Sequence, residues 1–305
     1  MKRLIIPFLL LTFMGCKNPT DLNKDGIPDE LAIALFAGGD NPGAIKAGME
    51  PFKIYLEKKL GIKVKYQFTT DYNATIEAIR AKKVHIAYLS PFSYVLASQK
   101  HDITPLVTIG ENGKPTMYHS VIFTNNFTGI NTMADLKAKA KQLTICFSDP
   151  ASTSGHLIPR AYLTTLGINT DNAFKANIFA GSHAASVLSV ASQKIDIGCS
   201  AIEYGIEKLE RGNLVKKEDL KILWTSDPIV SSPIVIRNDV NKVFAEKLKN
   251  IYLNLSHNAP EVFAAYLKLY HPDYKKLSYI PVQDSLYNGI RKIARGIKNL
   301  NMAGN

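Results

Sequence analysis

The chain has 305 residues and a formal net charge of +11 at pH 7. A chain of this length exceeds one comfortable hydrophobic core, so two lobes are the default expectation. The positive charge is spread thinly and forms no stripe with interleaved aromatic residues, which argues against a nucleic-acid partner and favours a field that draws anions toward a cleft.

The first sixteen residues resemble a bacterial lipoprotein signal peptide. Two basic residues precede an apolar run over residues 4–14, which is too short to span a bilayer, and Gly15-Cys16 follows. The resemblance implies that residues 1–15 are removed and that Cys16 carries lipid. We therefore expect an exported chain, anchored by lipid on the periplasmic side of the cell envelope. An uncleaved anchor or an ordinary secretory signal is the alternative.

Residues 16–30 are expected to form a polar tether. Within it, oxygen side chains stand at alternate positions around a glycine turn, as in calcium loops: Asp21, Asn23, Asp25 and Asp29. The twelfth position of such a loop holds a Glu, and here it holds Ala32. The segment is either a weak calcium site or a turn in a flexible tether. Nothing else in the sequence calls for a metal or a cofactor.

Strands and helices alternate from Leu31 onward. We expect strands over residues 31–36, 63–68 and 84–89, with amphipathic helices between them over 42–60 and 72–81. This order predicts a parallel sheet covered by helices on both faces. The same order returns after residue 130, and the chain beyond residue 240 is expected to be helical.

A hydroxyl-rich segment follows the strand expected over residues 143–147. Ser152, Thr153 and Ser154 stand where that strand ends and a helix begins, because apolar residues recur at helical spacing from Leu157. Hydroxyls and unpaired main-chain N–H groups at a helix start converge on a point that favours negative charge. The segment therefore predicts an oxyanion site. The alternative is that Ser152 or Thr153 merely caps the helix.

Two distant segments share a faint sequence echo. Residues 83–87 and 194–198 each combine a Lys, β-branched residues, one polar position and a small residue, and each leads into a helix that carries Tyr94 or Tyr204. The echo predicts two lobes of related topology with ligand between the carboxyl ends of their strands. Chance similarity of two buried strands is the alternative.

Cys146 and Cys199 lie in apolar segments with the composition of strands. We expect buried thiols there. A bridge between them stays open, because an exported protein folds in an oxidising compartment but no local spacing pattern supports one.

An ordered set of motifs resembles the substrate-binding proteins of phosphonate, phosphite and phosphate ABC importers. The set consists of Met49-Glu50-Pro51-Phe52, Thr70-Asp71-Tyr72, Ser90-Pro91-Phe92-Ser93-Tyr94, Tyr118-His119-Ser120, the segment over 152–156 and Gly181-Ser182-His183. The resemblance implies an α/β type II periplasmic-binding-protein fold, whose two lobes are joined by two hinge strands and close on ligand. It also implies a monomeric receptor that binds a small phosphorus oxyanion, uses no cofactor and delivers its ligand to an ABC permease.

The resemblance assigns the phosphorus oxyanion to six side chains: Tyr72, Tyr118, Ser152, Thr153, Ser154 and His183. Each has a purely structural alternative, as a packing tyrosine or a helix cap. Ser90 is a weaker candidate, because many relatives carry Gly there, and the ring of His156 is expected to point away. Some relatives place carboxylates against a ligand amine, which makes Glu203 and Asp227 candidates for the ligand tail or, equally, caps and surface charges.

Two other functions compete with transport. A receptor for a membrane histidine kinase would use the same cleft, so the sequence does not separate it from a transport receptor. A hydrolase would need a nucleophile, a base and an orienting acid, and Ser154, His183 and Asp196 supply those residue types. No Gly-x-Ser-x-Gly elbow surrounds the serine, however, and a hydroxyl cluster at a helix start is suited to receive negative charge.

The expected domain boundaries follow from two apolar crossings. We expect lobe 1 to comprise residues 31–122 and 230–305, and lobe 2 to comprise residues 123–229. The crossings are predicted near 118–123 and 232–236, where extended segments connect the two halves.

Overall fold

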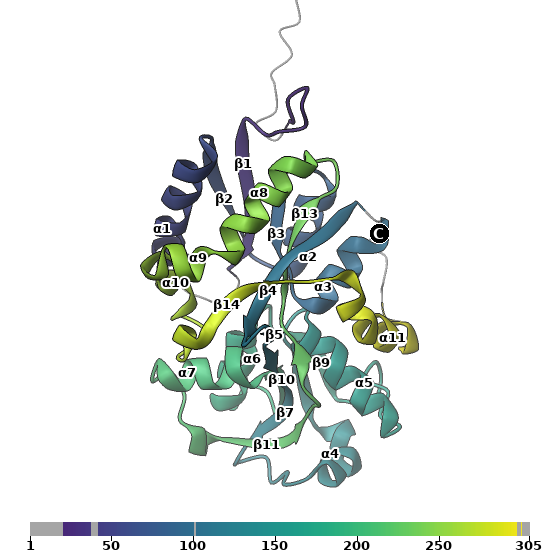
Figure 1. Cartoon of the computed structure of the whole chain (residues 1–305). Helices are drawn as coiled ribbons and strands as arrows, with labels where there is room; N and C mark the ends of the chain where they lie inside the picture. The colour runs from purple at the N-terminus through teal and green to yellow at the C-terminus, as the bar shows by residue number, and fades with distance from the viewer. Residues whose placement is uncertain (1–20, 38–41, 101, 298–299, 301–305) are drawn as a thin grey trace, which may run out of the picture.

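The computed structural model describes residues 21–37, 42–100, 102–297 and 300. The described chain forms two α/β lobes, each built on its own sheet, with one lobe above the other in Figure 1. The predicted signal peptide over residues 1–15, Cys16 and the first part of the tether lie outside the described residues.

The sheet of lobe 1 mixes parallel and antiparallel strands. Its order is β14 (Leu277–Pro281), β4 (Ile103–Glu111), β13 (Pro233–Arg237), β3 (Ile86–Tyr88), β1 (Glu30–Phe36) and β2 (Lys63–Thr69), with β5 (Lys114–Pro115) paired to β4. The strands β1, β2 and β3 run parallel, whereas β13, β4 and β14 pair antiparallel. The C-terminal region is therefore not wholly helical as predicted, because β14 joins the sheet.

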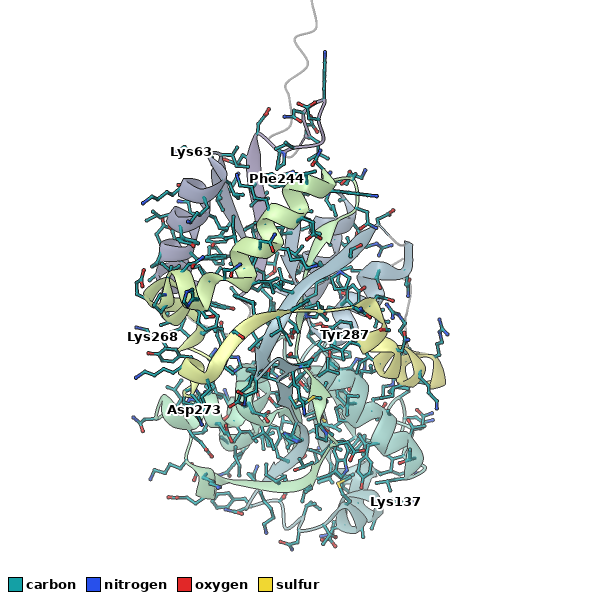
Figure 2. The ribbon with its side chains drawn as sticks, in the orientation of Figure 1. Lys63, Lys137, Phe244, Lys268, Asp273 and Tyr287 are labelled. Atoms are coloured by element: carbon teal, nitrogen blue, oxygen red, sulfur yellow. The ribbon has the colours of Figure 1, made fainter. Side chains whose placement is uncertain are left out.

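Helices cover both faces of this sheet. One face holds α1 (Pro42–Leu60), α8 (Lys242–Leu253), α9 (Leu255–Asn258) and α10 (Pro260–Leu267); the other holds α2 (Tyr72–Arg80), α3 (Pro91–Ala97) and α11 (Asn288–Gly296). Successive strand residues point to opposite faces, so Ile33 packs with the first set and Ala34 with the second. Figure 2 shows side chains filling the space between helices and sheet, with Phe244 on α8 and Tyr287 near α11.

Lobe 2 repeats this plan on a smaller sheet. Its order is β11 (Leu220–Thr225), β7 (Ser120–Asn125), β10 (Ile197–Ala201), β8 (Thr144–Phe147) and β9 (Ala176–Phe179). One face packs against α4 (Met133–Lys139) and α5 (Ile158–Thr165), and the other against α6 (His183–Ala191) and α7 (Glu207–Arg211).

Seven short helical turns complete the described elements. They are η1 (Ser98–Lys100), η2 (Ala140–Gln142), η3 (Thr153–Leu157), η4 (Ile202–Ile206), η5 (Lys217–Asp219), η6 (Tyr274–Lys276) and η7 (Asp284–Tyr287). Two of them, η3 and η4, are π-helical, a wider turn that is rare in proteins and is often found at functional sites.

Cys146 and Cys199 are buried free thiols on neighbouring strands of lobe 2. Cys146 packs among the residues of one sheet face and Cys199 among those of the other. A bridge would have to pass through the sheet, so strand alternation keeps the two thiols apart.

The lobes are joined by a two-stranded ribbon of β6 (Met117–Tyr118) and β12 (Ile229–Val230). The first crossing lies at the start of the range predicted for it, 118–123, because β7 already pairs with β10 from Ser120 onward. Residues 120–122, assigned to lobe 1 from the sequence, therefore belong to the sheet of lobe 2, and residues 233–236 lie within β13 of lobe 1. The apolar run over residues 121–123 carries no sequence signal for where a hinge ends and a sheet begins.

The segment over residues 21–29 forms a turn that rests on lobe 1. Asn23 Oδ1 accepts hydrogen bonds from the main-chain N–H groups of Asp25 and Ile27, and Asn241 at the start of α8 donates to Asp25 and Gly26 carbonyls. The Asn23 oxygen thus shapes the turn, and calcium binding at Asp21, Asn23, Asp25 and Asp29 stays a prediction.

None of the helices in the described ranges has the length and hydrophobicity needed to cross a bilayer.

Candidate functional site

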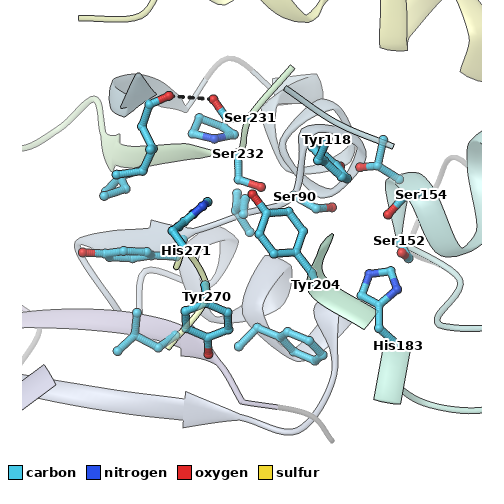
Figure 3. A pocket seen from close by; sticks show the side chains of 18 of the residues that line it. Ser90, Tyr118, Ser152, Ser154, His183, Tyr204, Ser231, Ser232, Tyr270 and His271 are labelled. Atoms are coloured by element: carbon cyan, nitrogen blue, oxygen red, sulfur yellow. Dashed lines mark hydrogen bonds between the residues drawn. The ribbon is translucent and has the colours of Figure 1, made fainter. Parts of the chain in front are cut away.

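A cavity of about 210 Å³ lies between the lobes, next to the hinge ribbon. It is smaller than the roughly 300–1,000 Å³ pockets that hold drug-sized ligands. Seven predicted site residues line it: Tyr72, Ser90, Tyr118, Ser152, Thr153, Ser154 and His183. Figure 3 shows several of them converging on one side of the cavity, and we call the Ser152-Thr153-Ser154 segment the cradle.

The cradle begins η3 at the carboxyl end of β8. Ser152 caps this turn, because its hydroxyl accepts a hydrogen bond of 3.0 Å from the Gly155 N–H. The Thr153 hydroxyl accepts a bond of 2.8 Å from the Phe92 N–H, so the same hydroxyl can still donate one hydrogen bond of its own. Ser152 is therefore the residue that caps the turn, whereas the Thr153 side chain bonds across to lobe 1.

His183 opens α6 and is held between two serines. Its Nδ1 atom lies 3.1 Å from Ser148 Oγ, 3.1 Å from Ser200 Oγ and 3.2 Å from the Ala201 main-chain N. A main-chain N–H can only donate, so Nδ1 must accept and the ring proton resides on Nε2. The imidazole that lines the cavity can thus act as an N–H donor.

Two glycines make room for this arrangement. A Cβ atom on Gly155 would lie 2.2 Å from Ser148 Oγ, and a Cβ atom on Gly205 would lie 2.2 Å from Ser200 Oγ. Gly155 lies in η3 after β8, and Gly205 lies in η4 after β10. The neighbouring strands β8 and β10 thus end in the same way, and together they fix the His183 ring.

The two predicted tyrosines come from lobe 1 and the hinge. Tyr72 follows the α2 cap and stacks on Phe36, with ring centroids 4.0 Å apart. Tyr118 lies in β6, and burial raises the pKa of its phenol above the usual range, while hydrogen bonds with Thr153 and Ser154 oppose this shift. The phenol therefore stays protonated and can donate at physiological pH.

Main-chain and side-chain hydrogen bonds connect the cradle to lobe 1. Ser93 Oγ donates to the Ala151 carbonyl at 2.9 Å, and Ser90, the cap of α3, reaches the same carbonyl at 3.3 Å. Asp149 accepts from the Tyr72 N–H at 3.4 Å and from Ala151 at 2.7 Å. Burial raises the pKa of the Asp149 carboxyl. Through these hydrogen bonds, the two lobes contact each other beside the cavity.

The two acidic candidates lie elsewhere. Both Glu203 oxygens bind His119, one at its main-chain N–H and the other 2.9 Å from its Nδ1 atom, and neither Glu203 nor Asp227 lines the cavity. In the hydrolase alternative, Asp196 would orient His183. Its carboxylate instead accepts two hydrogen bonds of 2.7 Å from Thr144. The His156 ring also lies apart, between Phe147 and Phe179.

The far side of the cavity was not anticipated from the sequence. It is lined by Tyr88, Tyr204, Lys208, Tyr266, Tyr270, His271 and Tyr279. Most of these residues come from η4, α7 and the segment after α10. The sequence pattern did not distinguish them from residues that pack in the core. Tyr204, at the end of the echo, was the one signal available.

Comparison with known proteins identifies the same type of molecule. Residues 38–287 match the family model described as "ABC transporter, phosphonate, periplasmic substrate-binding protein". The chain is 29% identical to the phosphate-import protein PhnD of Mycolicibacterium smegmatis, over 92% of this chain and 89% of that protein. It is 33% identical to the phosphonates-binding periplasmic protein of Escherichia coli, over 71% of this chain and 64% of that protein.

The fold has a close counterpart among solved structures. A binding-protein component of a phosphonate ABC transporter from Pseudomonas aeruginosa superposes with a TM-score of 0.76 and 26% identity, over 87% of this chain and 85% of that one. This likeness confirms the predicted type II periplasmic-binding-protein fold.

Proposed function

Because this chain belongs to the family of periplasmic substrate-binding proteins of phosphonate ABC transporters, we propose that its cradle binds the phosphorus oxyanion of a small phosphonate, phosphite or phosphate. Family membership makes it an extracytoplasmic component of an importer and not an enzyme. The relatives from E. coli and M. smegmatis, whose names specify phosphonates and phosphate, support this choice of ligand class.

The observation that carries the proposal is the set of neutral donors around one point. The Nε2–H group of His183, the Tyr118 phenol and the hydroxyls of the cradle all face the same cavity. Hydrogen bonds to a charged ligand contribute roughly 1.5–3 kcal/mol each. Four or five of them can exceed the roughly 8 kcal/mol of micromolar binding even after the entropic cost of association.

Neutral donors suit a receptor that must also release its ligand. They compensate the oxyanion charge by hydrogen bonding, without an ion pair that would deepen the bound state. Tyr72 from lobe 1 and the cradle from lobe 2 would then hold the same ligand, so that binding draws the lobes together about the β6–β12 ribbon.

Titration of the purified domain tests the ligand class. Phosphate, phosphite, methylphosphonate and 2-aminoethylphosphonate are added separately in a calorimeter, while turnover is monitored in parallel. We expect saturable binding without product. Release of product would support a hydrolase instead, and absence of binding for all four ligands would refute the proposal. X-ray scattering should also show a monomer that becomes more compact when ligand is added.

We further propose that Cys16 carries a lipid that holds the receptor at the membrane, next to its ABC permease. The proposal depends on the apolar run and Gly15-Cys16 at the start of the sequence. Labelling with a radioactive fatty acid tests it. The wild type should incorporate label and fractionate with membranes, whereas Cys16→Ser should do neither, and an unlabelled wild type would contradict it.

A further inference from the structure

The cavity continues from the cradle into an aromatic chamber. Tyr204 lies between the two parts: its ring centroid is 5.2 Å from that of Tyr118 on the hinge side and 5.7 Å from that of His271 on the far side. Figure 3 shows His271 and Tyr270 on the opposite side of the cavity from His183 and Ser152. A ligand held by its oxyanion would therefore extend its tail past Tyr204.

The walls of this chamber are aromatic and mutually packed. Tyr266 contacts both Tyr88, at 6.4 Å between centroids, and Tyr270, at 5.2 Å. Leu267 and Ile109 also line it. Such rings offer a large apolar surface at fixed positions, which favours carbon over charge in the tail of a ligand.

Lys208 is the one charged side chain among the described residues that line the chamber. The Lys208 ammonium lies 4.4 Å from the centroid of Tyr270, so the protein's own cation already occupies one aromatic face. Burial lowers the pKa of His271 to about 4, which leaves this ring neutral at physiological pH. No Asp or Glu lines the cavity within the described part of the chain, and Glu203 is engaged with His119.

We propose that the far end of the cavity binds the uncharged alkyl or aryl tail of an organophosphonate and selects against a tail ammonium. This inference rests on the proposed function, because the phosphonate head must occupy the cradle. An ammonium in this chamber would lose water, meet Lys208 and find no lining carboxylate among the described residues. An alkyl or aryl group would exchange water for contact with tyrosine rings.

A series of ligands with one head group tests the inference. Calorimetry compares methyl-, ethyl-, propyl- and phenylphosphonate with 2-aminoethylphosphonate, which has nearly the size of propylphosphonate. We expect affinity to rise about three- to fourfold with each buried methylene. Propylphosphonate should bind at least tenfold more tightly than 2-aminoethylphosphonate. Equal binding or a preference for the amine would overturn the inference.

Variants of Lys208 identify the cause. Lys208→Gln should narrow the ratio between the affinities for propyl- and 2-aminoethylphosphonate, and Lys208→Glu should reverse it; the ratio is the readout, because the two ligands share one phosphonate head. Lys137→Gln, at an exposed position on α4 of lobe 2, is the matched control and should leave all affinities unchanged. If Lys208→Glu still prefers propylphosphonate to 2-aminoethylphosphonate, Lys208 does not cause the selection against an ammonium, and that role of Lys208 is refuted.

The two levels of proposal fail in different ways. If no phosphonate, phosphite or phosphate binds, the proposed function is wrong. If phosphate and methylphosphonate bind but the longer alkyl and aryl compounds do not, the function stands and the inference about the tail is wrong. A normal near-ultraviolet circular dichroism spectrum for each variant establishes that it is folded.

Discussion

The Ala201 main-chain N–H donates to Nδ1 of His183 over 3.2 Å. Because this donor belongs to the backbone at the end of β10, the sheet itself determines which ring nitrogen carries the proton. Ser148 and Ser200 flank the same atom and keep the ring in place. The sheet of lobe 2 therefore presents an N–H group to the cavity whatever ligand arrives.

Substitution of His183 tests this assignment. His183→Gln can place an amide N–H near the position of Nε2, whereas the shorter side chain in His183→Asn cannot. We expect His183→Asn to lose ten- to a hundredfold in ligand affinity, corresponding to about 1.5–3 kcal/mol, and His183→Gln to lose less. Calorimetric titration measures both. Nitrogen NMR of the wild-type imidazole should find Nδ1 unprotonated, and a proton on Nδ1 would contradict the assignment.

Ser152 and Ser154 are expected to respond differently to substitution by Ala. Ser152 caps η3, so Ser152→Ala should lower the free energy of unfolding of the ligand-free protein by about 0.5–2 kcal/mol. Ser154 contacts Tyr118 through its hydroxyl and lies inside η3 and not at its cap, so Ser154→Ala should mainly weaken ligand binding, by ten- to a hundredfold.

Apo thermal melts and calorimetric titrations separate these two effects. The melts must be made without ligand, because ligand raises apparent stability by mass action. Unchanged ligand affinity in Ser154→Ala, together with a lowered melting temperature, would refute the proposed role of Ser154 in binding the oxyanion.

Gly155→Ala tests the close approach between η3 and the end of β8. The new methyl group would lie 2.2 Å from Ser148 Oγ and 2.4 Å from Ser148 Cβ, so one of the segments must move. We expect a loss of about 1–3 kcal/mol in unfolding free energy and weaker binding, because Ser148 also positions His183.

A second change can relieve the same clash. Ser148→Gly in the Gly155→Ala background should restore part of the lost stability, since it removes both crowded atoms. Gly289→Ala is the matched control, because a Cβ atom there meets nothing within 4 Å. Equal effects of the two alanine substitutions in urea unfolding would show that the contact is unimportant.

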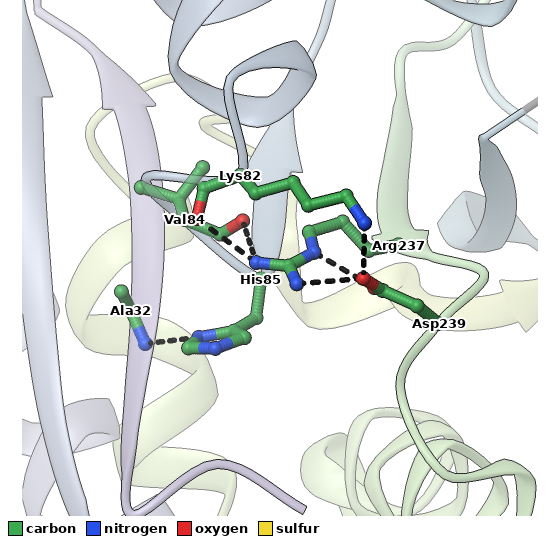
Figure 4. A network of polar contacts seen from close by, with 6 residues as sticks. All are labelled: Ala32, Lys82, Val84, His85, Arg237 and Asp239. Atoms are coloured by element: carbon green, nitrogen blue, oxygen red, sulfur yellow. Dashed lines mark hydrogen bonds and ion pairs between the residues drawn. The ribbon is translucent and has the colours of Figure 1, made fainter. Parts of the chain in front are cut away.

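The sequence echo corresponds to a shared structural role. His85 precedes β3, and its Nδ1 atom accepts a hydrogen bond of 3.0 Å from the Ala32 N–H of β1 (Figure 4). Asp196 precedes β10 and accepts one of 2.7 Å from the Thr144 N–H of β8. Each polar position thus binds the first part of the neighbouring parallel strand, which explains why a polar residue recurs in an otherwise apolar segment.

The sequence pattern predicted elements whose bounds depend on nearby residues better than features that depend on the tertiary fold. The helix expected over residues 42–60 has those bounds in the structure, because its apolar spacing and its flanks agree. The strand expected over 84–89 spans only Ile86–Tyr88, although the main chains of His85 and Leu89 still bond to the neighbouring strands β1 and β13. The aromatic chamber escaped prediction because Tyr204 and His271 meet only through tertiary folding.

Acid should destabilise the fold through its buried histidines. Burial lowers the pKa of His156 to about 4, and its Nδ1 atom lies 2.7 Å from the Pro150 carbonyl just before the cradle. Since an unfolded histidine titrates near pH 6.5, the unfolded chain takes up this proton first as the pH falls. The stabilisation is complete above pH 6.5 and declines toward pH 4, by up to about 3 kcal/mol for His156. His271 contributes in the same direction, because burial also lowers its pKa to about 4.

Urea unfolding of the ligand-free protein at pH 7, 5.5 and 4.5 measures this dependence. Asp149 acts in the opposite sense, because burial raises its carboxyl pKa and favours the protonated form in the fold. The comparison that isolates the histidine is therefore between wild type and His156→Gln, in which Asp149 is unchanged. We expect the variant to be less stable at pH 7, because the bond to Pro150 is altered, but to lose less stability between pH 6.5 and 4. Parallel pH profiles for the two proteins would show that His156 is not the proton-binding group, since every other titrating residue is common to both.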